Sequence, residues 1–174
     1  MNPIGDAFVA IRSFFEAGGH VLWAILFVTT LMWTFIVERL WFFRAELPGR
    51  IEAVAREWDA RTDTTSWYAR RVRDELISQV SIDARRYLLF VKTLMAVLPL
   101  LGLLGTVTGM IQVFGVMALT GTGNARLMAG GVSAATIPTM AGLVAALSGL
   151  YLATYLEQRA NSEVERTEDL LVRH

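Results

Sequence analysis

Two long stretches without Asp, Glu, Lys, Arg or His dominate the hydrophobic pattern of this sequence. They run from Thr93 to Ala125 and from Leu127 to Leu156. Each is longer than the roughly 20 apolar residues that a helix needs to cross a bilayer. We therefore expect two membrane helices at residues 93–120 and 127–156, joined by a short loop at residues 121–126.

An earlier hydrophobic block predicts another membrane helix at residues 20–43. Trp23 lies near one end, and the aromatic run from Trp41 to Phe43 lies near the other, a distribution typical of membrane interfaces. Glu38 and Arg39 are close to the second aromatic belt. We interpret them as interfacial charges that reach the polar layer or pair with a neighbour, because a buried charge is costly there. A proton-relay role for Glu38 is the alternative.

Residues 1–19 show a helical alternation of apolar and charged positions, which ends at Gly18-Gly19. The apolar positions are Ile4, Phe8, Ile11 and Phe15, and the charged ones are Asp6, Arg12 and Glu16. This pattern predicts an amphipathic helix lying in the membrane interface. The alternative is a short helix packed on the protein itself.

The polar segments at residues 44–92 and 157–174 also have helical periodicity. In the first, apolar residues recur from Ile51 to Trp58 and from Val72 to Ile82. We expect two or three short helices there, the last running straight into the second membrane helix. The final segment has no Gly or Pro, so the third membrane helix should continue into it.

The distribution of basic residues predicts the orientation. Nearly all Lys and Arg lie in residues 44–92 or 157–174, whereas only Arg12 and Arg126 lie on the other side. Cytoplasmic flanks of membrane helices collect Lys and Arg. The N-terminus and the loop at 121–126 should therefore be outside, and the two polar segments inside.

Composition supports an all-α integral membrane protein with three spans and argues against several other classes. The chain is 54% hydrophobic, has no Cys, and has only His20 and His174 as histidines. These counts disfavour thiol catalysis and a metal site within one chain. We also find no nucleophile–base pair, no cofactor motif and no sign of a nucleic-acid partner, and we expect no enzyme activity.

Small residues recur at helical spacing in both uncharged runs. They are Gly102, Gly105 and Gly109 in the first run, and Gly142, Ala146 and Gly149 in the second. Small side chains let helix backbones approach closely within a membrane. We expect these residues to pack against other helices.

Thr106 and Thr139 are equally far along the chain from the centre of the loop, so they should lie at similar membrane depth. We predict that their hydroxyls line a polar pathway, which Gln112 and Ser133 extend. The alternative is that each threonine bonds to a carbonyl of its own helix.

Pro138 should distort the third membrane helix beside Thr139. Its ring crowds the carbonyl of Ala134 and leaves that oxygen without its helical partner, so we expect a kink with an exposed acceptor. Neither uncharged run contains a group that titrates. Any titrating group on a proton pathway here must come from another chain.

Two blocks of this hairpin closely resemble the ExbB, TolQ and MotA proton-channel family, above all ExbB. They are LLGLLGTVTGM at Leu100–Met110 and GVSAATIPTMAGLVAAL at Gly131–Leu147. The resemblance implies an inner-membrane motor, a pentamer of three-span subunits driven by the proton motive force. It implies two partners besides membrane lipid, an ExbD-type subunit with a membrane Asp and a TonB-type protein, and a role in TonB-dependent uptake. The family's threonines correspond to Thr106 and Thr139.

The sequence departs from the family pattern at one position. ExbB and TolQ usually have a glutamate where this chain has Ala134, so a mechanism that requires this glutamate is in doubt. The segment from Ile137 to Met140 looks like the smaller ExbB proteins of accessory TonB systems. Two alternatives remain, a TolQ-like motor for envelope maintenance and a non-conducting scaffold that assembles a partner complex.

Overall fold

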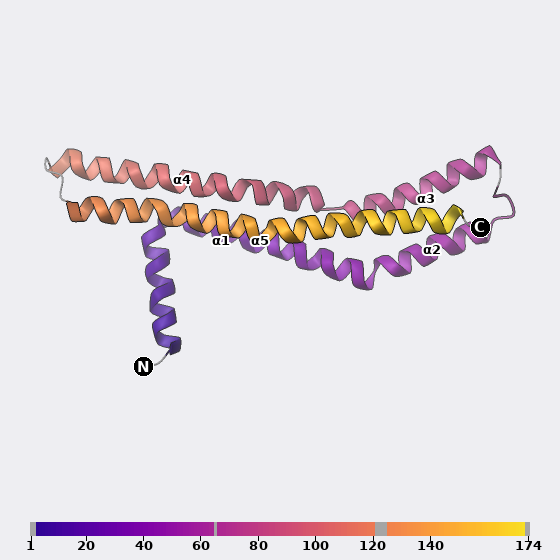
Figure 1. The fold of residues 1–174 in the computed structure, drawn as a ribbon, viewed down its shortest axis with the longest axis horizontal. Helices are drawn as coiled ribbons and strands as arrows, with labels where there is room; N and C mark the ends of the chain where they lie inside the picture. The colour runs from indigo at the N-terminus through magenta and orange to yellow at the C-terminus, as the bar shows by residue number, and fades with distance from the viewer. Residues whose placement is uncertain (1–2, 65, 121–124, 173–174) are drawn as a thin grey trace. The chain divides into compact units, whose positions relative to one another are not determined.

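The computed structural model describes residues 3–64, 66–120 and 125–172, and these residues form α-helices without a strand (Figure 1). The helices are α1 (Pro3–Ala45), α2 (Leu47–Asp59), α3 (Trp67–Arg85), α4 (Leu88–Thr120) and α5 (Ala125–Val172). The expected all-α fold is confirmed. Most of the loop expected at 121–126 lies outside the described residues.

Three helical stretches are long and apolar enough to cross a membrane. They are Gly18–Ala45, Trp67–Leu119, which includes the junction of α3 and α4, and Met128–Val172. This finding confirms the expected multi-pass membrane protein with three spans. The third stretch belongs to α5, whose 48 residues correspond to about 70 Å of helix at about 1.5 Å per residue. A hydrocarbon core is about 30 Å thick, so α5 extends well beyond one membrane crossing.

The chain forms two compact units. The first, here called the hairpin unit, comprises Met1–Met32 and Thr93–Leu150. The second, here called the polar unit, comprises Trp33–Lys92 and Tyr151–His174. Each unit therefore combines segments that are distant in the sequence, and each is described separately below.

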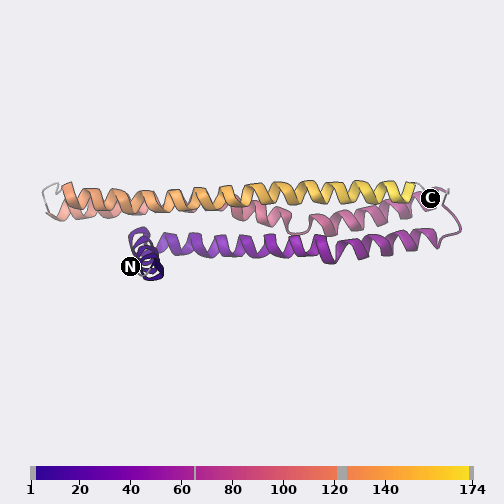
Figure 2. The same ribbon diagram turned by 60° about the horizontal axis from the view of Figure 1, so that its bottom comes forward.

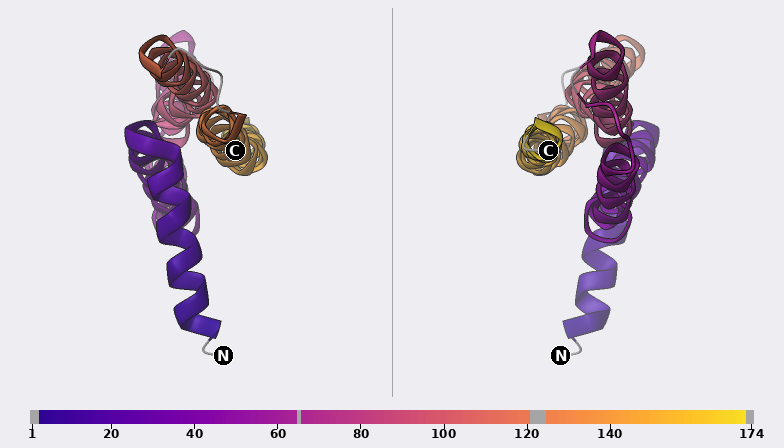
Figure 3. Two further views of the ribbon diagram at one scale, coloured as in Figure 1. Left: turned by 90° about the vertical axis from the view of Figure 1, so that its left-hand side faces the viewer. Right: turned by 90° about the vertical axis from the view of Figure 1, so that its right-hand side faces the viewer.

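In the hairpin unit, α4 and α5 run side by side, and α1 bends sharply before it joins them (Figures 1 and 2). The bend is at Gly19, whose φ of 64° and ψ of −162° are not helical. Glycine tolerates this conformation because it has no Cβ. The segment before Gly19 points away from the rest of α1 in the unit (Figure 3). The side chains of Ile4, Phe8 and Ile11, which define the expected amphipathic face, lie outside the described ones.

The core of the polar unit forms where α2, α3 and the end of α5 meet. Its buried residues are Trp58, Ala69, Leu76 and Leu171. Pro48 occupies the first turn of α2, and the Ser66 side chain caps α3 by accepting a hydrogen bond from the Ala69 N–H. Apolar periodicity and local capping thus explain why α2 and α3 begin where they do.

The junction of α3 and α4 corrects one expectation. The two helices were expected to be continuous, but Arg86 and Tyr87 separate them, and Tyr87 has a φ of 64°. A left-handed backbone is unfavourable for a residue with a bulky side chain. The Tyr87 ring lies 5.4 Å from the Phe35 ring and 5.1 Å from the Arg39 guanidinium, centre to centre. We attribute the break to these tertiary contacts, which no Gly or Pro signals in the sequence.

Candidate functional site in the α4–α5 hairpin

The small residues of α4 and α5 lie against each other along the hairpin. A Cβ added at Gly102 would be 2.9 Å from the Thr139 Cα, and one added at Gly109 would be 2.8 Å from the Ala135 Cα. Gly105 lies against the Pro138 ring in the same way. Such distances leave no room for a larger residue. These glycines therefore allow the two backbones to approach closely.

Gly142 and Gly149 continue this contact on α5. A Cβ at Gly142 would be 2.5 Å from the Leu98 carbonyl oxygen of α4, and one at Gly149 would be 2.6 Å from Met32 Sδ of α1. Ala146, which lies between these two glycines, is half-buried. The face of α5 that carries small residues therefore contacts two other helices of the hairpin unit.

Thr139 joins α5 to α4 through its side chain. Its Oγ1 donates a hydrogen bond of 3.0 Å to the Gly102 carbonyl, which is 37 residues away in the sequence. The absence of a side chain at Gly102 exposes this carbonyl to α5. A hydroxyl both donates and accepts, so Thr139 keeps an acceptor oxygen within the helix contact.

Thr106 uses its hydroxyl differently. Its Oγ1 donates 2.7 Å to the Leu103 carbonyl of its own helix, which is the local bond that a threonine in a membrane helix often makes. The contact between Gly105 and Pro138 involves the residues just before Thr106 and Thr139. The two threonines therefore lie at neighbouring levels of the hairpin.

Pro138 is fully buried, and α5 continues through it without interruption. The freed carbonyl belongs to Ala134, since a proline at position 138 cannot donate to it. Ala134 lines a cavity of about 220 Å³ in the hairpin unit. The expected distortion at Pro138 thus does not end the helix, and the residue with the free acceptor is next to open space.

The same cavity brings together polar residues from α1 and α4. His20 follows the bend at Gly19, and Thr108 and Gln112 are one turn apart on α4. Thr108 Oγ1 donates to the Leu104 and Gly105 carbonyls at 3.0 and 3.1 Å. Ser133, which was grouped with Gln112, is exposed and does not line the cavity.

His20 and Thr108 were not among the residues selected from the sequence for the polar pathway. The only local signal for His20 is its place directly after two glycines at the start of a membrane helix. Its approach to α4 depends on the bend in α1 and could not be read from spacing. Thr108 is on the same helix as Gln112, at the (i, i+4) spacing that places two residues on one face.

Glu38 and Arg39 form an ion pair in the polar unit. The Arg39 Nε and Nη2 atoms donate to the two Glu38 carboxylate oxygens at 2.7 and 2.8 Å. Arg39 is only 3% exposed, and its Nη1 donates 3.1 Å to the Asp83 carbonyl of α3. The guanidinium also lies 4.4 Å from the Phe42 ring centre. Arg39 therefore connects α1 to α3 through its bond to the Asp83 carbonyl, while Glu38 and Phe42 of its own helix hold the guanidinium in place.

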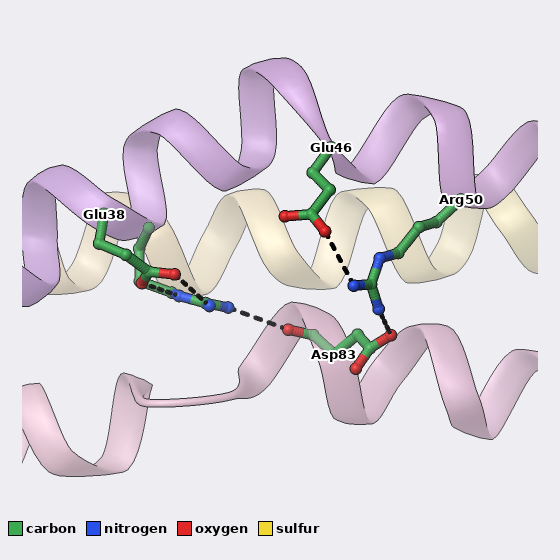
Figure 4. A network of polar contacts seen from close by, with 5 residues as sticks. Glu38, Glu46, Arg50 and Asp83 are labelled. Carbon is green, nitrogen blue, oxygen red and sulfur yellow. Dashed lines mark hydrogen bonds and ion pairs between the residues drawn. The ribbon is translucent and has the colours of Figure 1, made fainter.

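A second group of charges lies further along the chain, at the start of α2 (Figure 4). Arg50 donates to Glu46 at 2.9 Å and pairs with the Asp83 carboxylate. These hydrogen bonds raise the pKa of Arg50 above its ordinary value, and the bond to Glu46 has a larger effect than the bond to Asp83. Arg50 thus stays charged at any physiological pH, and Asp83 contacts both Arg39 and Arg50.

Among the described residues, no group of three or more His, Cys, Asp or Glu is placed to hold a metal ion. Around the cavity and the two threonines, the described side chains offer hydroxyls, the Gln112 amide and the His20 imidazole, together with backbone carbonyls. Such groups can hold water and pass hydrogen bonds along a chain. They do not include a carboxylate.

Comparison with known proteins identifies one family over most of the chain. A profile of the MotA/TolQ/ExbB proton channel family matches residues 42–169. ExbB-like protein 3 of Synechocystis sp. is 40% identical over 83 residues, which are 44% of this chain and 40% of that protein. The biopolymer transport protein exbB1 of Vibrio cholerae is 42% identical over 73 residues, 40% of this chain and 32% of that protein. The chain thus spans well under two thirds of the length of either relative.

Proposed function

Because the chain belongs to the MotA/TolQ/ExbB proton channel family, we propose that it is an ExbB-like subunit of a proton-driven motor in the bacterial inner membrane. The motor uses the proton motive force to energise TonB-dependent uptake across the outer membrane, without covalent chemistry on a substrate. The relatives named as ExbB-like or exbB1 favour ExbB over the TolQ alternative. In this proposal the N-terminus is periplasmic, and the polar unit is cytoplasmic.

The observation that carries the proposal is the bond from Thr139 to the Gly102 carbonyl. It places a hydroxyl between two membrane helices whose uncharged runs contain no titrating group. A proton path through such a hairpin needs a carboxylate from another chain. We propose that an ExbD-type subunit supplies this carboxylate as a membrane Asp, and that Thr139 and Thr106 hydrogen-bond to it or to water.

The available energy is sufficient for a motor. A charge that crosses the membrane releases about 2.3 kcal/mol per 100 mV, which shifts a two-state equilibrium by about 50-fold.

Several copies of the chain, a pentamer by analogy with the family, would surround the partner's helices. A TonB-type protein would receive the movement. Ala134, which stands where the family usually has a glutamate, lines the cavity, so in this proposal the chain moves protons without that glutamate.

Replacing both Thr106 and Thr139 with valine tests the proposal. Valine keeps the shape of threonine but removes the hydroxyl. Groups that transfer protons typically contribute about 10²–10⁴-fold to a rate. Uptake of a radiolabelled iron complex or of cobalamin should therefore fall about tenfold or more. The measurement uses cells in which the variant replaces the wild-type copy. Native mass spectrometry of the co-purified complex gives the subunit number and the partner.

Thr136→Val is the matched control, because Thr136 is on the same helix but is exposed and donates only to the Ser133 carbonyl of that helix, at 3.1 Å. It should leave uptake unchanged. A scaffold would continue to function after a protonophore collapses the gradient, and that result would contradict the proposal. A TolQ-like role would instead show as sensitivity of the cells to detergent with normal uptake.

A further inference from the structure

A cavity lined by two arginines lies between α1 and α5 in the polar unit. Its volume is about 190 Å³, and its lining residues are Leu40, Phe43, Arg44, Tyr155, Leu156 and Arg159. Leu40 and Arg44 are four residues apart on α1, as are Tyr155 and Arg159 on α5. Residues at this spacing share a helix face. Each helix thus presents an apolar or aromatic residue and, one turn later, a guanidinium.

The charge of this cavity is positive. Arg44 forms no ion pair with another residue in the described part of the chain. Arg159 pairs with Glu163 at 2.9 Å, and Glu163 is also 3.8 Å from Arg166. Among the residues that the structure describes, no carboxylate lines the cavity itself. One guanidinium is therefore unpaired, and the other shares its counterion with a third arginine.

The cavity is at the level expected for lipid headgroups. Arg44 is in the last turn of α1, beyond the hydrophobic block of that helix, and Arg159 comes shortly after the uncharged run that ends at Leu156. Trp41 is 74% exposed and Tyr151 is 76% exposed. Exposed Trp and Tyr beside the end of a membrane helix are typical of the interface between hydrocarbon and water.

We propose that this cavity binds the phosphate group of an anionic phospholipid. The planar guanidinium donates two parallel hydrogen bonds to phosphate oxygens, and two arginines from different helices can hold one phosphate between them. Tyr155 adds a phenol to the lining, while Leu40, Phe43 and Leu156 offer apolar contact to the glycerol and the upper acyl chains. The inference depends on the protein being in a membrane and not on its proposed role as a motor.

Selection among lipids should follow net charge. Phosphatidylglycerol brings a phosphate without a compensating cation, whereas phosphatidylcholine carries a choline that the arginines would repel. Basic residues near a membrane surface each favour anionic lipid about fivefold, so two of them predict a preference of about 30-fold. The bound lipid would join α1 to α5 at the edge of the polar unit.

Native mass spectrometry of the purified full chain tests the proposal, with equal amounts of phosphatidylglycerol and phosphatidylcholine in the detergent. The wild type should retain phosphatidylglycerol about 30-fold over phosphatidylcholine. Arg44→Ala with Arg159→Ala should retain the two lipids about equally. Arg44→Ala alone, which breaks no ion pair within the described chain, should lower the preference severalfold and does not depend on how the double variant folds.

Arg56→Ala with Arg70→Ala is the matched control, since it removes the same charge from exposed positions on α2 and α3. It should keep the wild-type preference. The proposal is overturned if the wild type retains both lipids equally, or if this control loses the preference as fully as the double cavity variant. If millimolar inorganic phosphate binds in phosphatidylcholine micelles with the same dependence on Arg44 and Arg159, the ligand is soluble phosphate and the lipid assignment is wrong.

Discussion

Thr106 and Thr139 have the same side chain, but the two hydroxyls have different partners. Thr106 donates to the Leu103 carbonyl in its own helix, whereas Thr139 donates to the Gly102 carbonyl in the neighbouring one. A carbonyl that already accepts within a helix has a second lone pair. Loss of the Thr139 hydroxyl should thus weaken the contact between α5 and α4. The Thr106 hydroxyl bonds only within α4.

At the same scale, Gly142→Ala should loosen the hairpin. The added Cβ would be 2.5 Å from the Leu98 carbonyl oxygen, and backbone cannot move aside as a flexible side chain can. We expect a loss of about 1–3 kcal/mol in stability, as for other overpacked sites. Thermal unfolding in detergent, followed by circular dichroism, measures the change.

Gly115→Ala is the control for that prediction, because a Cβ at Gly115 would have no atom within 4 Å apart from its chain neighbours and the backbone of its own helix. Alanine is a better helix former than glycine by up to about 1 kcal/mol, so this variant should be as stable as the wild type or more so. Equal melting temperatures for the two variants would show that Gly142 has no packing role.

At the scale of elements, the bend in α1 depends on one glycine. Gly19 has a φ of 64° and a ψ of −162°, a combination that residues with a Cβ adopt at a cost of about 1–3 kcal/mol. No atom lies within 4 Å of a Cβ at this position. Gly19→Ala therefore tests the backbone conformation without a clash.

We expect Gly19→Ala to straighten α1 and to lengthen the distance between spin labels at Ser13→Cys and Thr30→Cys, both in the hairpin unit. Electron paramagnetic resonance measures this distance, and the chain has no other cysteine to label. Gly49→Ala, which is also unobstructed but has no positive φ, should leave the distance unchanged. An unchanged distance in Gly19→Ala would mean that the bend is held by tertiary contacts.

The junction of α3 and α4 depends on Arg39. This residue is buried and contacts Glu38, the Asp83 carbonyl and the rings of Phe42 and Tyr87. Arg39→Ala should destabilise the polar unit by about 1–3 kcal/mol, because it removes the hydrogen bonds that the charged guanidinium donates to Glu38 and to the Asp83 carbonyl. Amide hydrogen exchange in residues 80–90 should become faster.

The control for Arg39 is Arg56→Ala. Arg56 is exposed and donates only to the Glu52 carbonyl of its own helix, at 3.3 Å. Substitutions at such surface sites usually change stability by no more than about 0.5 kcal/mol. If both variants exchange at the wild-type rate, Arg39 does not hold the junction.

At the scale of the whole molecule, the excess of Lys and Arg in residues 44–92 and 157–174 predicts which ends face the cytoplasm. Because the chain has no cysteine, single cysteines report the orientation directly. Ser13→Cys should react with a membrane-impermeant maleimide in cells whose outer membrane is permeabilised. Thr62→Cys and Ser162→Cys, both at exposed positions, should react only after the inner membrane is broken. Labelling of Thr62→Cys in intact spheroplasts would invert the proposed topology.

The sequence by itself determined the all-α class, the three membrane spans and the family. These properties follow from the length of the uncharged runs and from helical periodicity, and both are local along the chain. The uninterrupted extension of α5 through Val172 was predicted for the same reason, since no Gly or Pro follows its apolar run. The blocks around Thr106 and Thr139 identified the hairpin as the candidate site before any geometry was known.

Only the tertiary structure decided which partners these residues have. Several features depend on residues that are far apart in the sequence. They are the Thr139 bond to Gly102, the approach of His20 to Thr108 and Gln112, the break at Tyr87, and the cavity between Arg44 and Arg159. The physical reason is that helix formation depends on neighbours within about one turn, whereas hydrogen-bond partners and cavities depend on how helices pack. Sequence spacing could assign each residue to a helix face, but the packing of the helices determined which residues that face contacts.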